Sequence, residues 1–203
     1  MASLSVSCEL IEASKQEAHW RSLIKKIRKV YSGELTDAAN WSYEDQGESM
    51  EKKWWDAVDI IGIDAYYNTT QNGHEGWDQV LDNWKPIYKK LEGLHHKWKK
   101  NLMFTEVGYC PGNDCSRYGT PTEKGQDMMA MMYKALIYVW KDVSWFKGAF
   151  WWNWTTDNNF GGMTNACMDP KFKPAADVLH EYYGGSKGPR PEKTGPAKCL
   201  CTL

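Results

Sequence analysis

The stretch Val58-Asp-Ile-Ile-Gly-Ile-Asp-Ala-Tyr66 carries the strongest strand signal in the chain. It is rich in β-branched residues, and the turn signal Asn72-Gly73 follows it closely. Successive side chains of a strand point to opposite faces, so Asp64 and Tyr66 share one face. We therefore predict a strand that presents two polar groups on one face near its carboxyl end.

Other strands and helices alternate on both sides of this stretch. We predict further strands at residues 3–10, 35–41, 101–107 and 149–154, and helices that begin near residues 14, 77, 120 and 173. Ser14-Lys-Gln-Glu17 and Thr120-Pro-Thr-Glu123 are typical of helix starts, whereas Pro86 should kink or divide its helix. Five strand–helix units in sequence predict an α/β architecture with a parallel sheet.

Two parallel architectures fit this alternation, an open doubly wound sheet and part of a (β/α)8 barrel. No glycine-rich phosphate fingerprint follows any predicted strand, which disfavours a nucleotide-binding open sheet. A complete barrel has eight units and about 250 residues, whereas this chain has 203 residues. We therefore predict an incomplete (β/α)8 barrel with exposed, aggregation-prone edge strands over residues 1–185, and a flexible Gly-, Pro- and Lys-rich tail over residues 186–203.

Composition and charge exclude some classes of function. Lys and Arg number 25 against 26 Asp and Glu, which gives a formal net charge of −1 and argues against a dedicated nucleic-acid or membrane-surface partner. No apolar run is long enough to span a bilayer, and the first ten residues contain no export signal. The 12 Trp and 11 Tyr residues suit flat, hydroxyl-rich ligands such as sugars, but they also fill cores.

The cysteines and histidines give no strong metal-binding pattern. Cys8 lies within an apolar alternation and is expected to be a buried thiol. Cys110 and Cys115 flank a short turn and could bridge each other or Cys167, whereas a zinc site would need a second cysteine pair. We predict no metal and no cofactor. The following histidines are interpreted as loop or helix-surface residues: His74, His95 and His96.

Glu9 and Glu106 are the candidate catalytic groups. Each lies at or near the carboxyl end of a predicted parallel strand, which in a (β/α)8 barrel is the end that builds the active site. A structural ion pair or an exposed strand position would explain either residue alone. Two carboxyl groups across a barrel mouth are also what glycosidic bond cleavage requires, one as acid and the other as nucleophile or base.

Groups on neighbouring strands could support such a pair. The strand that ends at Tyr66 could donate a hydrogen bond to the attacking carboxylate. In the predicted strand at residues 149–154, Phe150, Trp152 and Trp154 share one face, and an indole there could form the floor of a sugar site. Core packing is the alternative for these tryptophans.

At these residues the chain resembles glycoside hydrolase family 113, the endo-β-1,4-mannanase-like members of the retaining clan A barrels. The resemblance runs from about residue 4 to residue 183. It rests on the order and spacing of several segments, among them Ser7-Cys-Glu-Leu10, Phe104-Thr-Glu-Val-Gly-Tyr109 and Gly148-Ala-Phe-Trp-Trp-Asn-Trp154. The resemblance implies that the five units correspond to strands four to eight of the barrel.

The resemblance also implies roles for individual residues. Glu9 corresponds to the acid/base after strand four, and Glu106 to the nucleophile after strand seven. Tyr66 matches the tyrosine of strand six, and Cys8 stands where many clan A enzymes have Asn. The remaining residues that the resemblance places in the substrate cleft are Asn40, Trp41 and either Trp152 or Trp154. Asp64 is a further candidate because it shares the strand face of Tyr66.

The function implied is hydrolysis of β-1,4 bonds in mannan-type polysaccharide by double displacement with retention. We predict that the incomplete barrel is impaired by truncation and is weakly active or inactive alone. The resemblance further implies a secreted parent protein that supplies the missing N-terminal half of the barrel. One alternative is a clan A hydrolase that acts on another β-glucan. Another is a non-catalytic carbohydrate-binding or degenerate barrel protein, which needs neither glutamate. A third is a truncated product that neither folds stably nor works.

Overall fold

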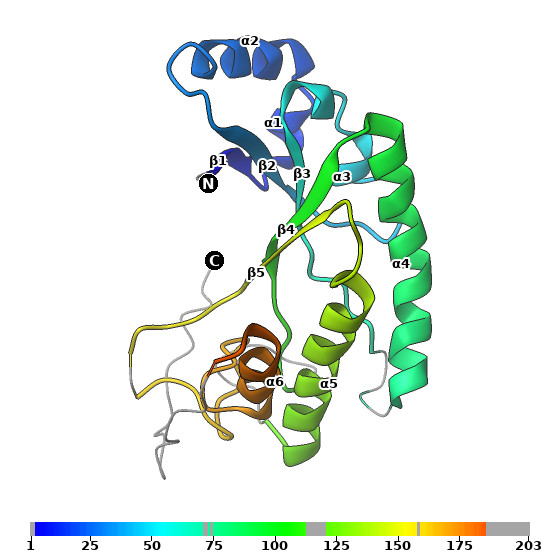
Figure 1. The fold of residues 1–203 in the computed structure, drawn as a ribbon, viewed down its shortest axis with the longest axis vertical. Coiled ribbons are helices and arrows are strands. Elements are labelled where there is room, and N and C mark those ends of the chain that lie inside the picture. Colours follow the sequence, from blue (N-terminus) through cyan, green and yellow to red (C-terminus); the bar gives the residue numbers. More distant parts are fainter. Residues whose placement is uncertain (1–2, 71–72, 74, 113–120, 158, 186–203) are drawn as a thin grey trace. The chain divides into compact units, whose positions relative to one another are not determined.

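A parallel sheet of five strands, in the order β1-β2-β3-β4-β5, is the framework of the structure (Figure 1). This computed structural model describes residues 3–70, 73, 75–112, 121–157 and 159–185. The predicted tail at residues 186–203 therefore lies outside the described residues. So do the following residues named above: Asn72, His74, Cys115 and Thr120.

The strands and helices alternate along the chain as predicted. The strands are β1 Ser3–Cys8, β2 Glu34–Asn40, β3 Ile60–Asp64, β4 Asn101–Val107 and β5 Phe146–Trp151. The helices are α1 Ile11–Ser14, α2 Glu17–Ile27, α3 Glu48–Glu51, α4 Trp77–Trp98, α5 Glu123–Trp140 and α6 Pro174–Tyr183, with a 3-10 turn at Trp55–Ala57. Each strand pairs with its neighbour in sequence, as in a barrel wall. The fold is an incomplete (β/α)8 barrel.

Several predicted boundaries were wrong. Ser14 ends the short helix α1 and donates its hydroxyl to the carbonyl of Ile11, so it does not cap α2. Pro86 lies inside α4, which continues as one helix through it. The last strand ends at Trp151, so Trp152 and Trp154 lie beyond it. These errors have one origin. A local sequence motif can resemble a helix cap or a break, but it does not determine which neighbouring backbone groups are available for hydrogen bonds.

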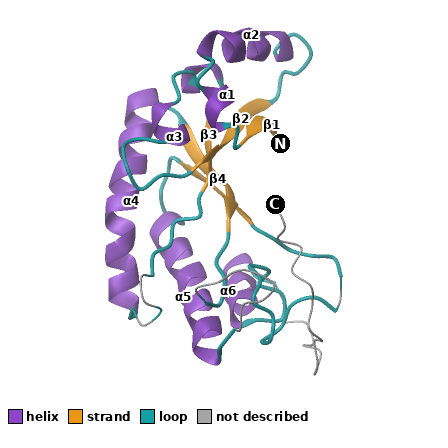
Figure 2. Cartoon of the chain, turned by 180° about the vertical axis from the view of Figure 1, so that it is seen from behind, coloured by secondary structure: helices purple, strands orange, loops and turns teal. Residues whose placement is uncertain are grey.

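The chain divides into two compact units. The first unit comprises Met1–Tyr67, Lys85–Val107 and Asp142–Phe150, and it contains β1 to β4. Figure 2 shows these four strands side by side, in orange. The buried core of this unit consists of large apolar side chains from the strands and from the segment after α3. It includes Leu35, Trp54, Trp55, Ile61, Ile63, Leu102 and Phe104.

The second unit comprises Asn68–Trp84, Gly108–Lys141 and Trp151–Leu203, and it contains α5 and α6. Thr122 caps α5 by accepting the N–H of Gly125 at 3.0 Å. Trp151 stacks on the buried Tyr133, with ring centroids 4.6 Å apart. This tryptophan therefore packs within the unit, which is the alternative noted for this aromatic segment. Cys110 and Cys167 of this unit are both disulfide-bonded.

Two register shifts interrupt the regular pairing of the sheet near the carboxyl ends of its strands. Ser5 pairs with Thr36 while Cys8 pairs with Ala38, so β1 contains one extra residue. In the same way, β4 contains one extra residue between Phe104 and Glu106. A bulge of this kind re-aims the side chains that follow it.

A buried ion cluster links β1, β2 and α3. The ammonium group of Lys52 pairs with Asp37 and lies 3.2 Å from Glu48 Oε1, and all three side chains are fully buried. Ser7 of β1 donates its hydroxyl to Asp37, and the N–H of Asn40 donates to Glu48 Oε2 at 3.1 Å. The cluster therefore anchors the carboxyl ends of β1 and β2 through one cation.

Substitution of Lys52 should destabilise the fold strongly. Lys52→Met leaves Asp37 and Glu48 buried without their cation, and breaking a buried ion pair costs about 3–5 kcal/mol. We expect a loss of that size in the free energy of unfolding measured by urea denaturation. Lys53→Met, at the adjacent exposed position, should change it by less than about 0.5 kcal/mol. Equal effects of the two substitutions would contradict the role given to the cluster.

β1 is an outer strand of the described sheet, and its side chains are poorly covered. Leu4 is 39% exposed, and the first three residues of the strand are all exposed. An exposed edge strand presents unpaired N–H and C=O groups that pair readily with other chains. This exposure agrees with the edge strands predicted from the count of strand–helix units.

A charge on β1 should reduce self-association of the chain. Leu4→Lys places a cation on the edge strand, a substitution that opposes edge-to-edge pairing. We expect a smaller fraction of large species in size-exclusion chromatography with light scattering. Val30→Lys is the matched control, because Val30 is 88% exposed but lies outside the sheet. If both variants reduced association equally, general solubility rather than the edge would be responsible.

Candidate active site

Three carboxyl groups lie at the carboxyl ends of neighbouring parallel strands. Glu9 directly follows β1, Asp64 is the last residue of β3, and Glu106 is the penultimate residue of β4. The pairs β1–β2, β2–β3 and β3–β4 are all parallel, so these strand ends meet at one edge of the sheet. The predicted strand-end positions of Glu9 and Glu106 are therefore present in the structure.

Glu106 is half-buried and held at both its backbone and its side chain. The hydroxyl of Tyr66 donates to Glu106 Oε2 at 2.7 Å, and the N–H of Ala65 donates to the Glu106 carbonyl at 2.6 Å. This is the hydrogen bond expected from the strand that ends at Tyr66. Burial and the negative charge of Glu106 both raise the pKa of Tyr66, so its hydroxyl remains a donor at neutral pH.

Asp64 is fully buried beside Glu106. Thr105 donates its hydroxyl to Asp64 Oδ1 at 2.7 Å, and the thiol of Cys8 lies 3.6 Å from Asp64 Oδ2. Burial, together with the negative charges of Glu106 and Glu9, raises the pKa of Asp64 to about 7. Asp64 therefore gains or loses its proton near neutral pH.

Glu9 adopts a backbone conformation that is uncommon for a residue with a side chain. Its φ is 53°, in the left-handed region, and its N–H donates to the carbonyl of Ala38 at 2.8 Å. Such a conformation costs on the order of 1–2 kcal/mol and often occurs at functional positions. Partial desolvation and the negative charges of Glu106 and Glu48 raise the pKa of Glu9, which favours its protonated form.

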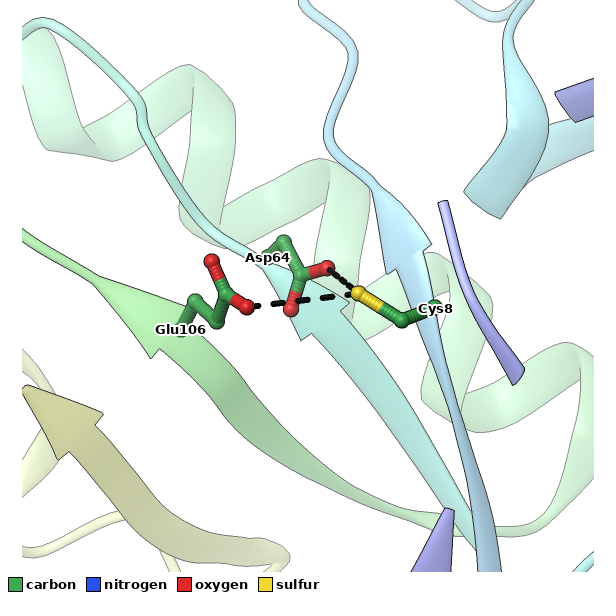
Figure 3. A group of neighbouring side chains, drawn as sticks. All are labelled: Cys8, Asp64 and Glu106. Atoms are coloured by element: carbon green, nitrogen blue, oxygen red, sulfur yellow. Dashed lines mark hydrogen bonds between the residues drawn. The ribbon is translucent and has the colours of Figure 1, made fainter. Parts of the chain in front are cut away.

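Cys8 is exposed, which corrects the prediction of a buried thiol. Strict alternation placed Cys8 on the apolar face with Leu4, but the extra residue in β1 breaks that alternation. The thiol instead points toward Asp64 and Glu106, and its sulfur lies 4.0 Å from Glu106 Oε1 (Figure 3). Sequence alone offered no signal for this bulge.

The cluster of Cys8, Asp64 and Glu106 has a spacing that could suit a cation. One ligand atom from each residue lies within 4.8 Å of the other two. A thiol binds metal as the thiolate, however, and burial and the carboxylates raise the pKa of Cys8 to about 12. The cluster is therefore better described as a hydrogen-bonded group, and we assign it no metal.

Asn40 and Trp41 lie at the carboxyl end of β2, as predicted. Trp41 packs against Tyr43 and Tyr67, with ring centroids 4.8 Å and 5.4 Å from its own. These three rings form an aromatic cluster beside the strand ends. Tyr43 and Tyr67 were not predicted as site residues. Tyr67 directly follows the predicted strand, and that position could have indicated it.

Trp152 and Trp154 belong to the second unit and are 37% and 51% exposed. Their surfaces are thus available to a ligand, and their role in sugar binding stays a prediction. Thr105 was also missed, although it stands within the segment Phe104-Thr-Glu that indicated the site. In the described part of the chain, no helix is long and apolar enough to cross a membrane.

Residues 1–174 match the model of Glycoside Hydrolase Family 113. The chain belongs to this family. The match includes the strand ends that carry Glu9, Asp64 and Glu106. A search of the curated proteins found no match.

Solved structures of family 113 are similar to the chain over most of its length. The GH113 β-mannanase AaManA from Alicyclobacillus acidocaldarius, in complex with ManMIm, has 27% identity and a TM-score of 0.70, with 90% of this chain and 55% of AaManA covered. A GH113 β-1,4-mannanase has 26% identity and a TM-score of 0.69, with coverages of 91% and 56%. The chain thus spans about half the length of these enzymes.

More distant structures share the fold alone. The β-glucuronidase of Bifidobacterium dentium has 18% identity and a TM-score of 0.58, with 90% of the family 113 chain and 28% of the glucuronidase covered.

The buried carboxyl group of this family 113 chain should make stability depend on pH. The pKa of Asp64 rises from 3.8 to about 7 on folding, so the folded state binds more protons between these values. Its contribution to stability is therefore largest below pH 3.8 and falls as pH rises to about 7. From pH 4 to 7, the free energy of unfolding should fall by on the order of 3 kcal/mol more in the wild type than in Asp64→Asn.

Urea denaturation across this pH range would measure the difference. Asp127→Asn, at an exposed position of α5, is the matched control and should follow the wild-type curve. Parallel curves for the wild type and Asp64→Asn would show that Asp64 titrates as an ordinary exposed carboxyl group.

Proposed function

We propose that the chain contributes the catalytic carboxyl pair of a retaining glycoside hydrolase that cleaves β-1,4 bonds in mannan-type polysaccharide. The observation that carries this proposal is the different environment of two strand-end carboxyl groups. Glu106 receives a hydrogen bond from Tyr66, which suits a carboxylate that must be aimed. Glu9 has a raised pKa, which suits a proton donor.

In the first step, a carboxylate oxygen of Glu106 attacks C1 of the sugar and forms an ester bond. The glycosidic C1–O bond breaks, and the proton of Glu9 passes to the departing oxygen. In the second step, Glu9 takes a proton from water while the water oxygen attacks C1. The ester bond breaks and Glu106 returns as a carboxylate, so the anomeric configuration is retained.

The raised pKa of Glu9 serves this sequence of steps. The acid must hold its proton until the leaving oxygen needs it, and the nearby charge of Glu106 helps to hold it. Once Glu106 is esterified its negative charge is gone, so the pKa of Glu9 falls. Glu9 is then ionised and able to act as a base toward water.

Two observations support the substrate class: the mannanases among the similar family 113 structures, and the exposed aromatic side chains of this chain. The two family 113 structures at 26% and 27% identity are named as β-mannanases. Sugar rings stack on exposed aromatic faces, and we propose Trp41, Trp152 and Trp154 as such faces. We further propose Asn40 and Asp64 as groups near the bound sugar. A clan A hydrolase for another β-glucan would use the same carboxyl pair and differ in these surroundings.

We also propose that the catalytic domain over residues 1–185 works with three further strand–helix units that complete the barrel wall. The family 113 structures are covered to only 55% and 56% by this chain. The exposed edge at Leu4 would pair with the last of those units.

Substitution of either glutamate should lower the rate of hydrolysis strongly. Glu106→Gln removes the nucleophile and should lower kcat/KM on β-1,4-manno-oligosaccharides at least about a thousandfold. Glu9→Gln removes the acid and should lower it about 10²–10⁴-fold. The control Glu181→Gln lies at an exposed position of α6 and should leave the rate unchanged. Product release would be followed by chromatography, and the anomeric outcome by NMR.

The opposite results identify the alternatives. Hydrolysis at the wild-type rate by Glu106→Gln would exclude this mechanism. A folded wild-type chain that binds β-mannan in affinity electrophoresis, without turnover even when the proposed further units are supplied, would favour a non-catalytic carbohydrate-binding protein. A chain with no cooperative urea transition would favour a truncated product that does not fold.

A further inference from the structure

The thiol of Cys8 lies between Glu106, the proposed nucleophile, and Asp64, a carboxyl group that takes no step in the proposed mechanism. Its sulfur is 3.6 Å from Asp64 Oδ2 and 4.0 Å from Glu106 Oε1 (Figure 3). The three residues come from three different strands, β1, β3 and β4. Cys8 therefore contacts residues of two other strands that are distant from it in the sequence and close to it only in the folded chain.

The remaining oxygens of the two carboxyl groups already have donors. Thr105 donates to Asp64 Oδ1 at 2.7 Å, and Tyr66 donates to Glu106 Oε2 at 2.7 Å. Each carboxyl group thus has one oxygen bound by a hydroxyl group and the other facing the thiol. An S–H group is a weak donor, and carboxylates accept only, so the proton of Cys8 points to one of the two at a time.

The electrostatic surroundings keep that proton on the sulfur. Partial desolvation of the sulfur and the negative charges of Asp64, Glu106 and Glu9 raise the pKa of Cys8 to about 12. These are the charged groups that face the thiol from β3, β4 and the end of its own strand. The thiol is consequently a hydrogen-bond donor at every pH at which the enzyme would act, and a poor nucleophile.

We propose that Cys8 is a positioning residue whose S–H group couples Asp64 to Glu106 and aims the Glu106 carboxylate together with Tyr66. This role rests on the proposed function of Glu106 as nucleophile. When Asp64 is ionised it competes with Glu106 for the thiol proton. When Asp64 is protonated, the thiol is free to donate its hydrogen bond to Glu106. The protonation state of Asp64 therefore determines, through Cys8, whether the Glu106 carboxylate receives this hydrogen bond.

The coupling can be tested without catalysis, through the reactivity of the thiol. Iodoacetamide reacts with the thiolate, whose fraction well below the pKa rises tenfold for each unit by which the pKa falls. We expect Asp64→Asn and Glu106→Gln each to raise the alkylation rate of Cys8 at pH 8.5 about tenfold. Asp127→Asn should leave it unchanged. Mass spectrometry of the Cys8 peptide separates this thiol from the other cysteines.

Unfolding would also separate the thiol from the two carboxyl groups, so each variant is first shown to unfold cooperatively in urea, and the rates are compared in the folded state. If Cys8 reacts at the rate of an ordinary thiol in the wild type, or if neither carboxyl substitution changes the rate, the coupling does not exist. This result is independent of whether Glu106→Gln is active, so the proposed function and the coupling fail separately.

A second comparison tests the positioning role in the active enzyme. Cys8→Ala should lower kcat on manno-oligosaccharides about 2- to 10-fold with KM within about twofold, because the carboxylate loses a weak donor but the sugar site is intact. Cys8→Ser keeps a donor and should recover most of the rate. Equal losses in the two variants, or a change in KM alone, would overturn the positioning role.

Discussion

Crowded negative charge at one end of the sheet is the constraint on which the candidate site depends. Glu9, Asp64 and Glu106 come from adjacent or nearly adjacent parallel strands, so the fold cannot separate them. Within the described residues, the side-chain donors that reach Asp64 and Glu106 are the neutral groups of Thr105, Tyr66 and Cys8. Neutral donors orient a carboxyl group without the strong pKa lowering that a cation produces. The crowding is therefore expressed as raised pKa values of Glu9 and Asp64.

In the ion cluster of Lys52, within the same unit, buried carboxyl groups are paired with a cation instead of neutral donors. Asp37 and Glu48 are as deeply buried as Asp64, but they share one ammonium group. That cation also lies 4.3 Å from the ring centroid of Trp54. Charges of this kind, which share one cation, hold backbone segments together, here the ends of β1 and β2. The first unit thus contains two kinds of charge close together in the sequence: the Lys52 cluster, which holds strands together, and the strand-end carboxyl groups, for which we propose chemical roles.

The sequence predicted the alternation of strands and helices, because hydrophobic periodicity depends mostly on local residues. The strand Asn101–Val107 was predicted with its exact ends, and the strand-end positions of Glu9 and Glu106 followed from parallel topology. The face of Cys8 could not be predicted in this way. One extra residue in β1 reverses the alternation, and the bulge is defined by pairing with β2 rather than by β1 itself. The contacts of Thr105 depend on a second bulge of the same kind.

Two of the groups proposed for sugar stacking, Trp152 and Trp154, have a different structural origin from the groups proposed for bond cleavage. Glu9, Tyr66 and Glu106 all belong to the first compact unit, and their arrangement follows from strand pairing within it. Trp152 and Trp154 belong to the second unit, beyond the end of β5. Strand pairing fixes geometry over fractions of an ångström, as transition-state chemistry requires, whereas stacking of a sugar on an indole tolerates more variation. Under this proposal one catalytic constellation can serve related polysaccharides, because the residues proposed to select the sugar can change without altering the strand pairing around Glu106.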